Sequence, residues 1–141
     1  MLPTEYAQWV ANELTKRFKV SKWSFSLSAT DANRWALRLA RMVTKRPKVL
    51  AVSYGYHGTV DETFVVKGEN GETLLRPGNV GSPGNIEDTT RVAECNDLES
   101  VDKALSNADV AVIITEPALT NIGIVLPEPG FLEGLRELAT K

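Results

Sequence analysis

The 141-residue chain has the length of one ordinary domain, and its 43% hydrophobic and 24% charged residues are typical of a globular protein with a buried core. Its net charge is −2 and its basic residues are spread along the sequence, which argues against nucleic acid or an anionic membrane as the main partner. A single cysteine and a single histidine exclude an intramolecular disulfide and the usual zinc ligand sets, so we expect no metal site and a reducing, cytoplasmic setting.

The N-terminal part predicts two amphipathic helices separated by a strand. Apolar residues recur at steps of three and four over residues 4–18, which predicts a helix that packs one face on the core. Apolar residues alternate with serines over residues 23–28, which predicts a half-buried strand. The next helix, capped by Ser28 or Thr30 and ending near Pro47, should follow directly. The face that we expect it to bury consists of Ala32, Trp35, Ala36, Leu39, Met42 and Val43.

The middle of the sequence combines a clear strand with a stretch of weak pattern. Residues 48–53 form a continuous apolar run, as a parallel strand covered on both faces requires, and a glycine-bearing turn follows at residues 54–58. Residues 61–88 are rich in glycine, proline and asparagine and show no sustained periodicity. We expect them to form a long surface loop.

Regular alternation resumes after this stretch. The patterns predict a strand over 89–95, a helix over 98–106 capped near Asn96 or Asp97, a strand over 109–115 and a helix over 129–139. Strands that alternate with helices form right-handed crossovers, so the expected fold is α/β, with a mostly parallel sheet flanked by helices.

Three loops follow predicted strands, at residues 28–30, 56–58 and 116–121. The carboxyl ends of parallel strands share one edge of the sheet, so these loops can converge on one ligand. Each loop also has an ordinary structural explanation: a helix cap, a packed tyrosine and histidine, or the extended residue before a proline. Hydroxyl groups at a helix N-terminus, however, are suited to binding a phosphate.

The motifs at these loops resemble those of a known enzyme family. They are SATDANRWALRLAR at 28–41, YHGTVDE at 56–62 and EPALTNIGIVLPEPGFLEGLREL at 116–138, in the same order and spacing. The sequence is similar to class III (subgroup II) pyridoxal-phosphate-dependent aminotransferases, and most like the branch that includes glutamate-1-semialdehyde aminomutase. This resemblance implies the three-layer large domain of fold type I, with residues 1–141 forming a partial domain truncated at both ends.

The resemblance also implies a phosphate-binding corner. It assigns backbone and hydroxyl contacts with the cofactor phosphate to Ser28, Ala29 and Thr30, where the residue pattern by itself predicts a helix N-terminus. The family more often has glycine and glutamate where this chain has Ala29 and Asp31. A methyl group at position 29 requires a backbone with negative φ.

The remaining cofactor contacts implied by the resemblance involve the pyridine ring. Tyr56 corresponds to an aromatic residue that stacks on the ring, and His57 completes the same turn. Glu116 corresponds to an acidic residue beside the ring, and Asn121 to a donor for the ring oxygen. Family members are generally homodimers, and they transfer an amino group between a donor and an acceptor.

The family's later segments supply an aspartate for the pyridine nitrogen and the lysine that forms the Schiff base, and neither is expected in this chain. We therefore expect the chain by itself not to transaminate. One alternative is a stand-alone, non-catalytic module that binds a phosphorylated small molecule or a protein partner, which should have a closed, polar sheet edge. Another is an unrelated α/β phosphate-binding domain.

Overall fold

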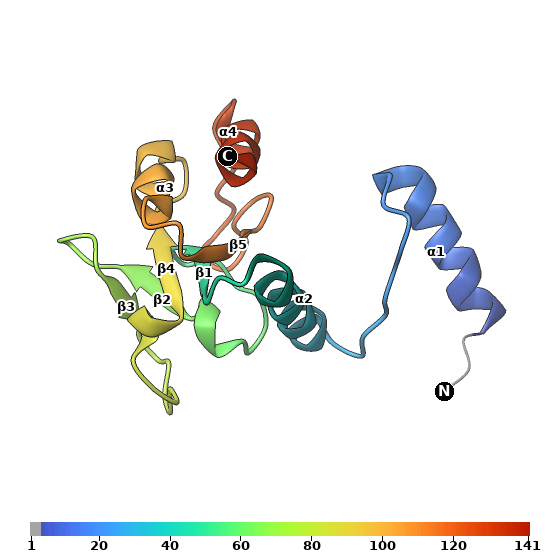
Figure 1. Cartoon of the computed structure of the whole chain (residues 1–141), viewed down its shortest axis with the longest axis horizontal. Helices are drawn as coiled ribbons and strands as arrows, with labels where there is room; N and C mark the ends of the chain where they lie inside the picture. The colour runs from blue at the N-terminus through green and yellow to red at the C-terminus, as the bar shows by residue number, and fades with distance from the viewer. Residues whose placement is uncertain (1–3) are drawn as a thin grey trace.

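A parallel three-stranded sheet forms the centre of the computed structural model, which describes residues 4–141 (Figure 1). The middle strand is β1 (Lys48–Val52), which pairs in parallel with β4 (Thr90–Ala93) on one side and β5 (Val110–Ile114) on the other. All of β1 except its first residue is buried, as its unbroken apolar sequence predicts. The predicted α/β class and parallel pairing are confirmed.

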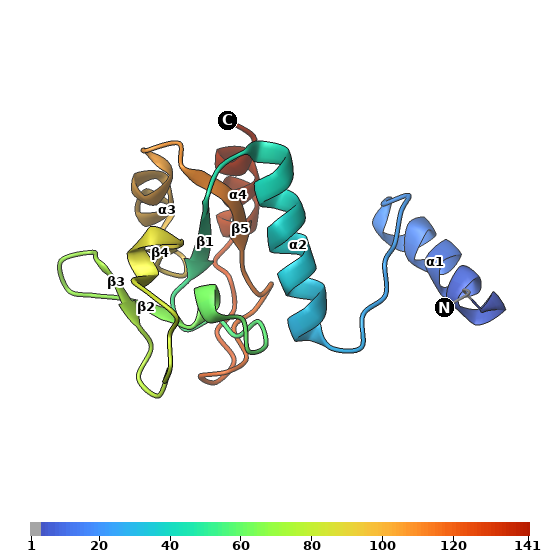
Figure 2. The same cartoon turned by 60° about the horizontal axis from the view of Figure 1, so that its bottom comes forward.

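Helices cover both faces of this sheet and create three layers (Figure 2). On one face, α3 (Leu98–Leu105) and α4 (Phe131–Thr140) pack against Leu50 through Val101, Phe131 and Leu135. On the other face, Leu37 of α2 (Ala29–Thr44) contacts Val49. Alternate residues of β1 thus enter opposite cores, which is the period of a strand. Asp97 caps α3, one of the two caps that the sequence allows.

The prediction of a long surface loop over residues 61–88 is wrong for the central part of this stretch. This stretch contains two short 3₁₀ helices, η1 (Asp61–Thr63) and η2 (Ile86–Asp88), and an antiparallel pair of strands, β2 (Val65–Lys67) and β3 (Thr73–Leu75). Val65 and Ile86 are buried against Ala51 and Val92 of the parallel sheet. Three-residue strands are too short to produce a periodic signal, so only their packing identifies them.

The strand predicted over residues 23–28 does not form. The segment between α1 (Glu5–Phe18) and α2 pairs with no strand among the described residues, and Leu27 is fully exposed. The Trp23 indole instead folds back on the end of α1: its Nε1 donates to Thr15 Oγ1 of the helix at 3.0 Å and to the carbonyl of Val20, just after the helix, at 2.9 Å. Alternation describes a residue pattern, but a strand needs a neighbour to satisfy its backbone.

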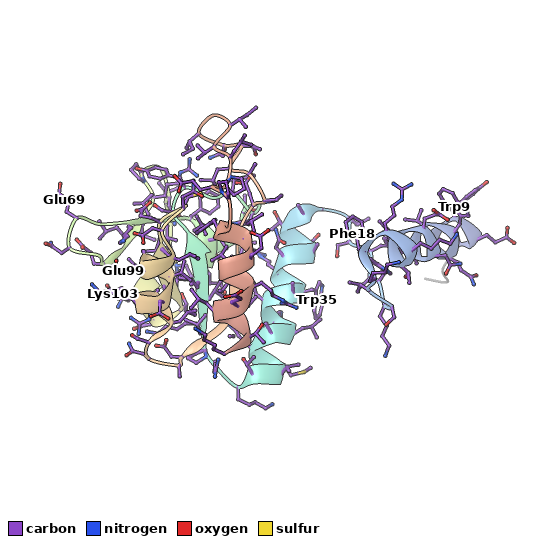
Figure 3. The ribbon with its side chains drawn as sticks, turned by 90° about the horizontal axis from the view of Figure 1, so that it is seen from above. Trp9, Phe18, Trp35, Glu69, Glu99 and Lys103 are labelled. Atoms are coloured by element: carbon purple, nitrogen blue, oxygen red, sulfur yellow. The ribbon has the colours of Figure 1, made fainter. Side chains whose placement is uncertain are left out.

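The predicted core faces of the first two helices are also wrong. α1 buries no residue and lies apart from the sheet, and Figure 3 shows Trp9 and Phe18 on its surface. α2 buries only Leu37, and Figure 3 shows Trp35 on the side of α2 away from the sheet. The exposed members of the expected α2 face include Trp35, Leu39, Met42 and Val43. An amphipathic pattern reveals an apolar face but not what covers it.

None of the helices within residues 4–141 combines the length and apolarity needed to cross a membrane.

Candidate cofactor site

The N-terminus of α2 meets the loop that follows β1. The Thr59 backbone N–H donates to Thr30 Oγ1 at 3.0 Å, and the two threonine hydroxyls lie 3.5 Å apart. One turn further along α2, Asn33 Nδ2 donates to the His57 carbonyl at 2.8 Å. These contacts join the first two of the three predicted loops, although they lie about thirty residues apart in the sequence.

Gly58 makes this close approach possible. A Cβ atom at this position would lie 2.3 Å from Thr30 Oγ1 and 2.9 Å from Thr30 Cα, inside the contact distance of any real side chain. Its φ of +81° is also a conformation that L-residues rarely adopt. Glycine is therefore required at position 58 by both space and backbone conformation.

The first turn of α2 offers free hydrogen-bond donors. Ser28 is the N-cap: its Oγ accepts from the Asp31 N–H at 3.2 Å and donates to the Asp31 carboxylate at 3.0 Å. The N–H groups of Ala29 and Thr30 have no acceptor among the described residues. These N–H groups and the helix dipole of a 16-residue helix favour an anion at this point. Ala29 is not among the residues with positive φ, so its methyl group causes no backbone strain.

Glu116 joins the third loop to the second. Its Oε1 accepts from the Tyr56 N–H at 2.9 Å, and its Oε2 accepts from the N–H and the hydroxyl of Thr120 at 3.2 and 2.7 Å. Partial burial acts to raise the pKa of Glu116, but these hydrogen bonds outweigh it and lower the pKa below its ordinary value. Glu116 is therefore a carboxylate that holds Tyr56 in place.

Tyr56 and His57 occupy different environments within one turn. Tyr56 is 46% exposed, and its ring meets the Phe64 ring edge-on, with centroids 5.9 Å apart. His57 is only 7% exposed, and its Nε2 has no partner among the described residues. Burial lowers the pKa of His57, and the nearby Glu116 carboxylate offsets this only in part. The imidazole is therefore neutral at pH 7, and it packs against Gly55.

Asn121 lies at the surface of the third loop and contacts a residue that the sequence analysis did not single out. Its amide lies against Arg76, and because a guanidinium only donates hydrogen bonds, we assign the amide oxygen as the atom that accepts from Nη1 and Nη2 of Arg76 at 2.8 and 2.6 Å. Thr59, Asn33 and Arg76 were all missed as site residues. Thr59 follows the YHG motif directly and could have been found from it, whereas Arg76 lies in the stretch of weak pattern and gave no signal.

The profile of the family described as "Aminotransferase class-III" matches residues 1–141, which is the whole chain. The chain belongs to the class-III aminotransferase family. It is 40% identical over 137 residues to a glutamate-1-semialdehyde 2,1-aminomutase of Saccharolobus islandicus, covering 97% of this chain and 32% of that protein. It thus spans about a third of the length of such relatives.

Solved structures of the family agree with this fold. The structure of a glutamate-1-semialdehyde aminomutase from Pseudomonas aeruginosa matches with a TM-score of 0.93 and 46% identity, over 99% of this chain and 31% of that one. A variant of the same Pseudomonas protein, solved in complex with PMP, matches equally well. The predicted family and fold class are therefore confirmed.

The residues of this class-III chain fit a phosphorylated cofactor of the kind that the family uses. The free N–H groups of Ala29 and Thr30 can donate hydrogen bonds to a phosphate, and Arg34, which donates to the Thr59 carbonyl at 3.2 Å, adds positive charge beside them. The exposed Tyr56 ring can contact an aromatic ligand. No group of three or more His, Cys, Asp or Glu side chains within residues 4–141 is arranged to hold a metal ion.

Proposed function

We propose that residues 1–141 form part of the large, cofactor-binding domain of a pyridoxal-phosphate-dependent aminotransferase of the glutamate-1-semialdehyde aminomutase type. The observation that carries this proposal is the convergence of three distant loops. The hydrogen bonds from Thr59 to Thr30 and from Tyr56 to Glu116 bring these loops together. This convergence occurs at the carboxyl edge of a parallel sheet, where such folds bind ligands.

The proposed phosphate site consists of Ser28, Ala29 and Thr30. The two free N–H groups at positions 29 and 30 would donate to phosphate oxygens. Ser28 contributes mainly as the N-cap, because its hydroxyl already donates to Asp31. The Thr30 oxygen accepts from Thr59, so its own hydrogen can be donated to the phosphate.

The proposed ring site consists of Tyr56, His57, Glu116 and Asn121. Tyr56 would lie against the cofactor ring, and Glu116 would hold Tyr56 in place through its hydrogen bond to the Tyr56 N–H. Asn121 would donate to an oxygen on the cofactor ring. His57 would stabilise this turn by packing beneath its surface, against Gly55, as a neutral, buried imidazole. When bound, pyridoxal phosphate supplies two things: an aldehyde carbonyl that can receive an amino group, and a ring that withdraws electrons.

We further propose that the Schiff-base lysine is not among the lysines of this chain, and that the chain by itself does not transaminate. Lys67 is the one lysine that follows an apolar run, and its Nζ donates to Ser100 Oγ at 2.8 Å. In the complete enzyme, the amino group would pass from a donor to an acceptor, or to another carbon of the same molecule in an aminomutase. We also propose a cytoplasmic homodimer, which the exposed apolar faces of α1 and α2 support.

Titration of the purified chain with pyridoxal phosphate tests the proposed binding. Thr30→Val removes the hydroxyl with little change in shape, and the matched Thr44→Val removes a hydroxyl at the other end of α2 that donates to Ala40. We expect Thr30→Val to weaken binding several-fold and Thr44→Val to leave it unchanged. Equal affinities for pyridoxal phosphate and phosphate-free pyridoxal would contradict the proposed phosphate site.

Reduction with borohydride tests the position of the lysine. We expect no adduct at a single lysine and no amino transfer by the chain alone. Labelling of Lys67 or any other single lysine together with turnover would refute this part of the proposal.

The alternative of a stand-alone binding module is not favoured. Such a module should close its sheet with a polar edge, but β5 pairs only with β1 among the described residues and is entirely apolar. Four of its five residues are only partly buried. This open apolar edge fits a sheet that continues in a larger protein.

A further inference from the structure

Arg76 holds together three segments at the edge of the proposed site. Its backbone N–H donates to the Phe64 carbonyl at 2.9 Å, which fixes it at the end of the β2–β3 pair. Its Nη1 lies 3.4 Å from the Tyr54 carbonyl, and its guanidinium lies 5.5 Å from the centre of the Tyr54 ring. The same guanidinium makes two short contacts with the amide of Asn121.

The chemistry of the guanidinium determines which way the Asn121 amide faces. An arginine side chain only donates hydrogen bonds, so the atom that it contacts at 2.6–2.8 Å is the amide oxygen. The amide nitrogen, with its two N–H donors, then faces away from Arg76. Among the described residues Arg76 forms no salt bridge, so no carboxylate competes with Asn121 for the guanidinium.

We infer that Arg76 is a positioning residue for the cofactor site: by holding the Asn121 oxygen, it leaves the Asn121 N–H groups to bind an acceptor oxygen on the ligand. This inference rests on the proposed function, because the ligand that receives this hydrogen bond is pyridoxal phosphate. Without Arg76 the amide can rotate by half a turn and present its oxygen instead. A ligand oxygen would then meet an acceptor rather than a donor.

The first test uses the ligand-free chain and measures whether the two side chains interact. Asn121→Asp replaces the side-chain amide with a carboxylate, which should pair more strongly with Arg76. We expect Asn121→Asp to raise the melting temperature of the wild-type chain but not that of the Arg76→Gln variant. An equal effect in both backgrounds would overturn the inference without affecting the proposed function.

The second test measures pyridoxal phosphate affinity. Arg76→Gln, whose side chain both donates and accepts, should weaken binding about tenfold, the effect of one well-placed hydrogen bond. Arg76→Lys, which can only donate, should restore most of the affinity. Asn121→Ala and Asn121→Asp should both weaken binding, although the second keeps its contact with Arg76.

Arg38→Gln serves as the control, because Arg38 stacks on the exposed Trp35 of α2, and it should bind like wild type. Wild-type affinity in Arg76→Gln would overturn the inference alone, whereas failure of the wild-type chain to bind would overturn both the inference and the proposed function.

Discussion

Replacing Gly58 with alanine tests the contact on which the candidate site depends. The new methyl would lie 2.3 Å from Thr30 Oγ1, so the loop after β1 or the N-terminus of α2 must move. Overpacking of this kind costs about 1–3 kcal/mol, and the positive φ adds about 1–2 kcal/mol. We therefore expect Gly58→Ala to lower the free energy of unfolding by about 3 kcal/mol and the melting temperature by about 10 °C.

Gly130→Ala is the matched control. Gly130 has a similar φ of +89°, but a Cβ there would have no neighbour within 4 Å. Gly130→Ala should cost only the backbone strain of about 1–2 kcal/mol. Alanine also restricts the unfolded chain, but this effect is the same in both variants and cancels when they are compared. Thermal unfolding compares the two, and pyridoxal phosphate titration should show weaker binding only for Gly58→Ala. Equal destabilisation of the two variants would refute the argument from the Thr30 contact.

Three further predictions concern titration and packing. Because the pKa of Glu116 is lowered in the folded chain, its carboxylate stabilises the protein above its ordinary pKa of 4.5, and this contribution is lost as the pH falls. Glu116→Gln should therefore be less stable than wild type at pH 7 and equally stable near pH 3. A deficit in stability that does not depend on pH would contradict this. Burial lowers the pKa of His57, the sole histidine, so the free energy of unfolding should fall as the pH drops below 6.5. His57→Asn should remove most of this pH dependence between pH 6.5 and about 5, as measured by urea unfolding. The same pH dependence in His57→Asn and wild type would disprove the prediction. Leu37→Ala should lower the free energy of unfolding by about 2–5 kcal/mol, because Leu37 is only 2% exposed. Trp35→Ala should lower it by less than about 0.5 kcal/mol, because Trp35 is 60% exposed. A larger loss for Trp35→Ala than for Leu37→Ala would contradict the observed orientation of α2.

Local sequence patterns predicted the elements of the sheet well. The continuous apolar run of β1 identified a parallel strand buried on both faces, and Pro129 near the start of α4 marked a helix. The loops at Tyr56 and Glu116 were correctly expected to meet, because β1 and β5 are parallel and place their carboxyl ends at one edge. Thr30 also meets them, but through the N-terminus of α2 and not through a strand. What was not predictable was which atoms would touch.

Patterns failed where a residue needed a distant neighbour. The alternation around Trp23 predicted a strand, but no second strand lies beside it among the described residues. The apolar pattern of α2 predicted a buried face that includes Trp35 and Leu39, yet the one buried residue of α2 is Leu37, which is not part of that face. Arg76 lies in a stretch without periodicity, so its contact with Asn121, 45 positions away, had no local signature.

The sequence by itself therefore determined the family, the α/β class and the hydroxyl-rich start of α2, because motifs, apolar runs and caps are local properties of the chain. Only the tertiary structure decided that Thr30 lies against Gly58, that Nε2 of the buried His57 has no partner within residues 4–141 and that Arg76 faces Asn121. These are contacts between segments far apart in the sequence, and they depend on how the sheet, the helices and the β2–β3 pair pack together. The site is a product of that packing.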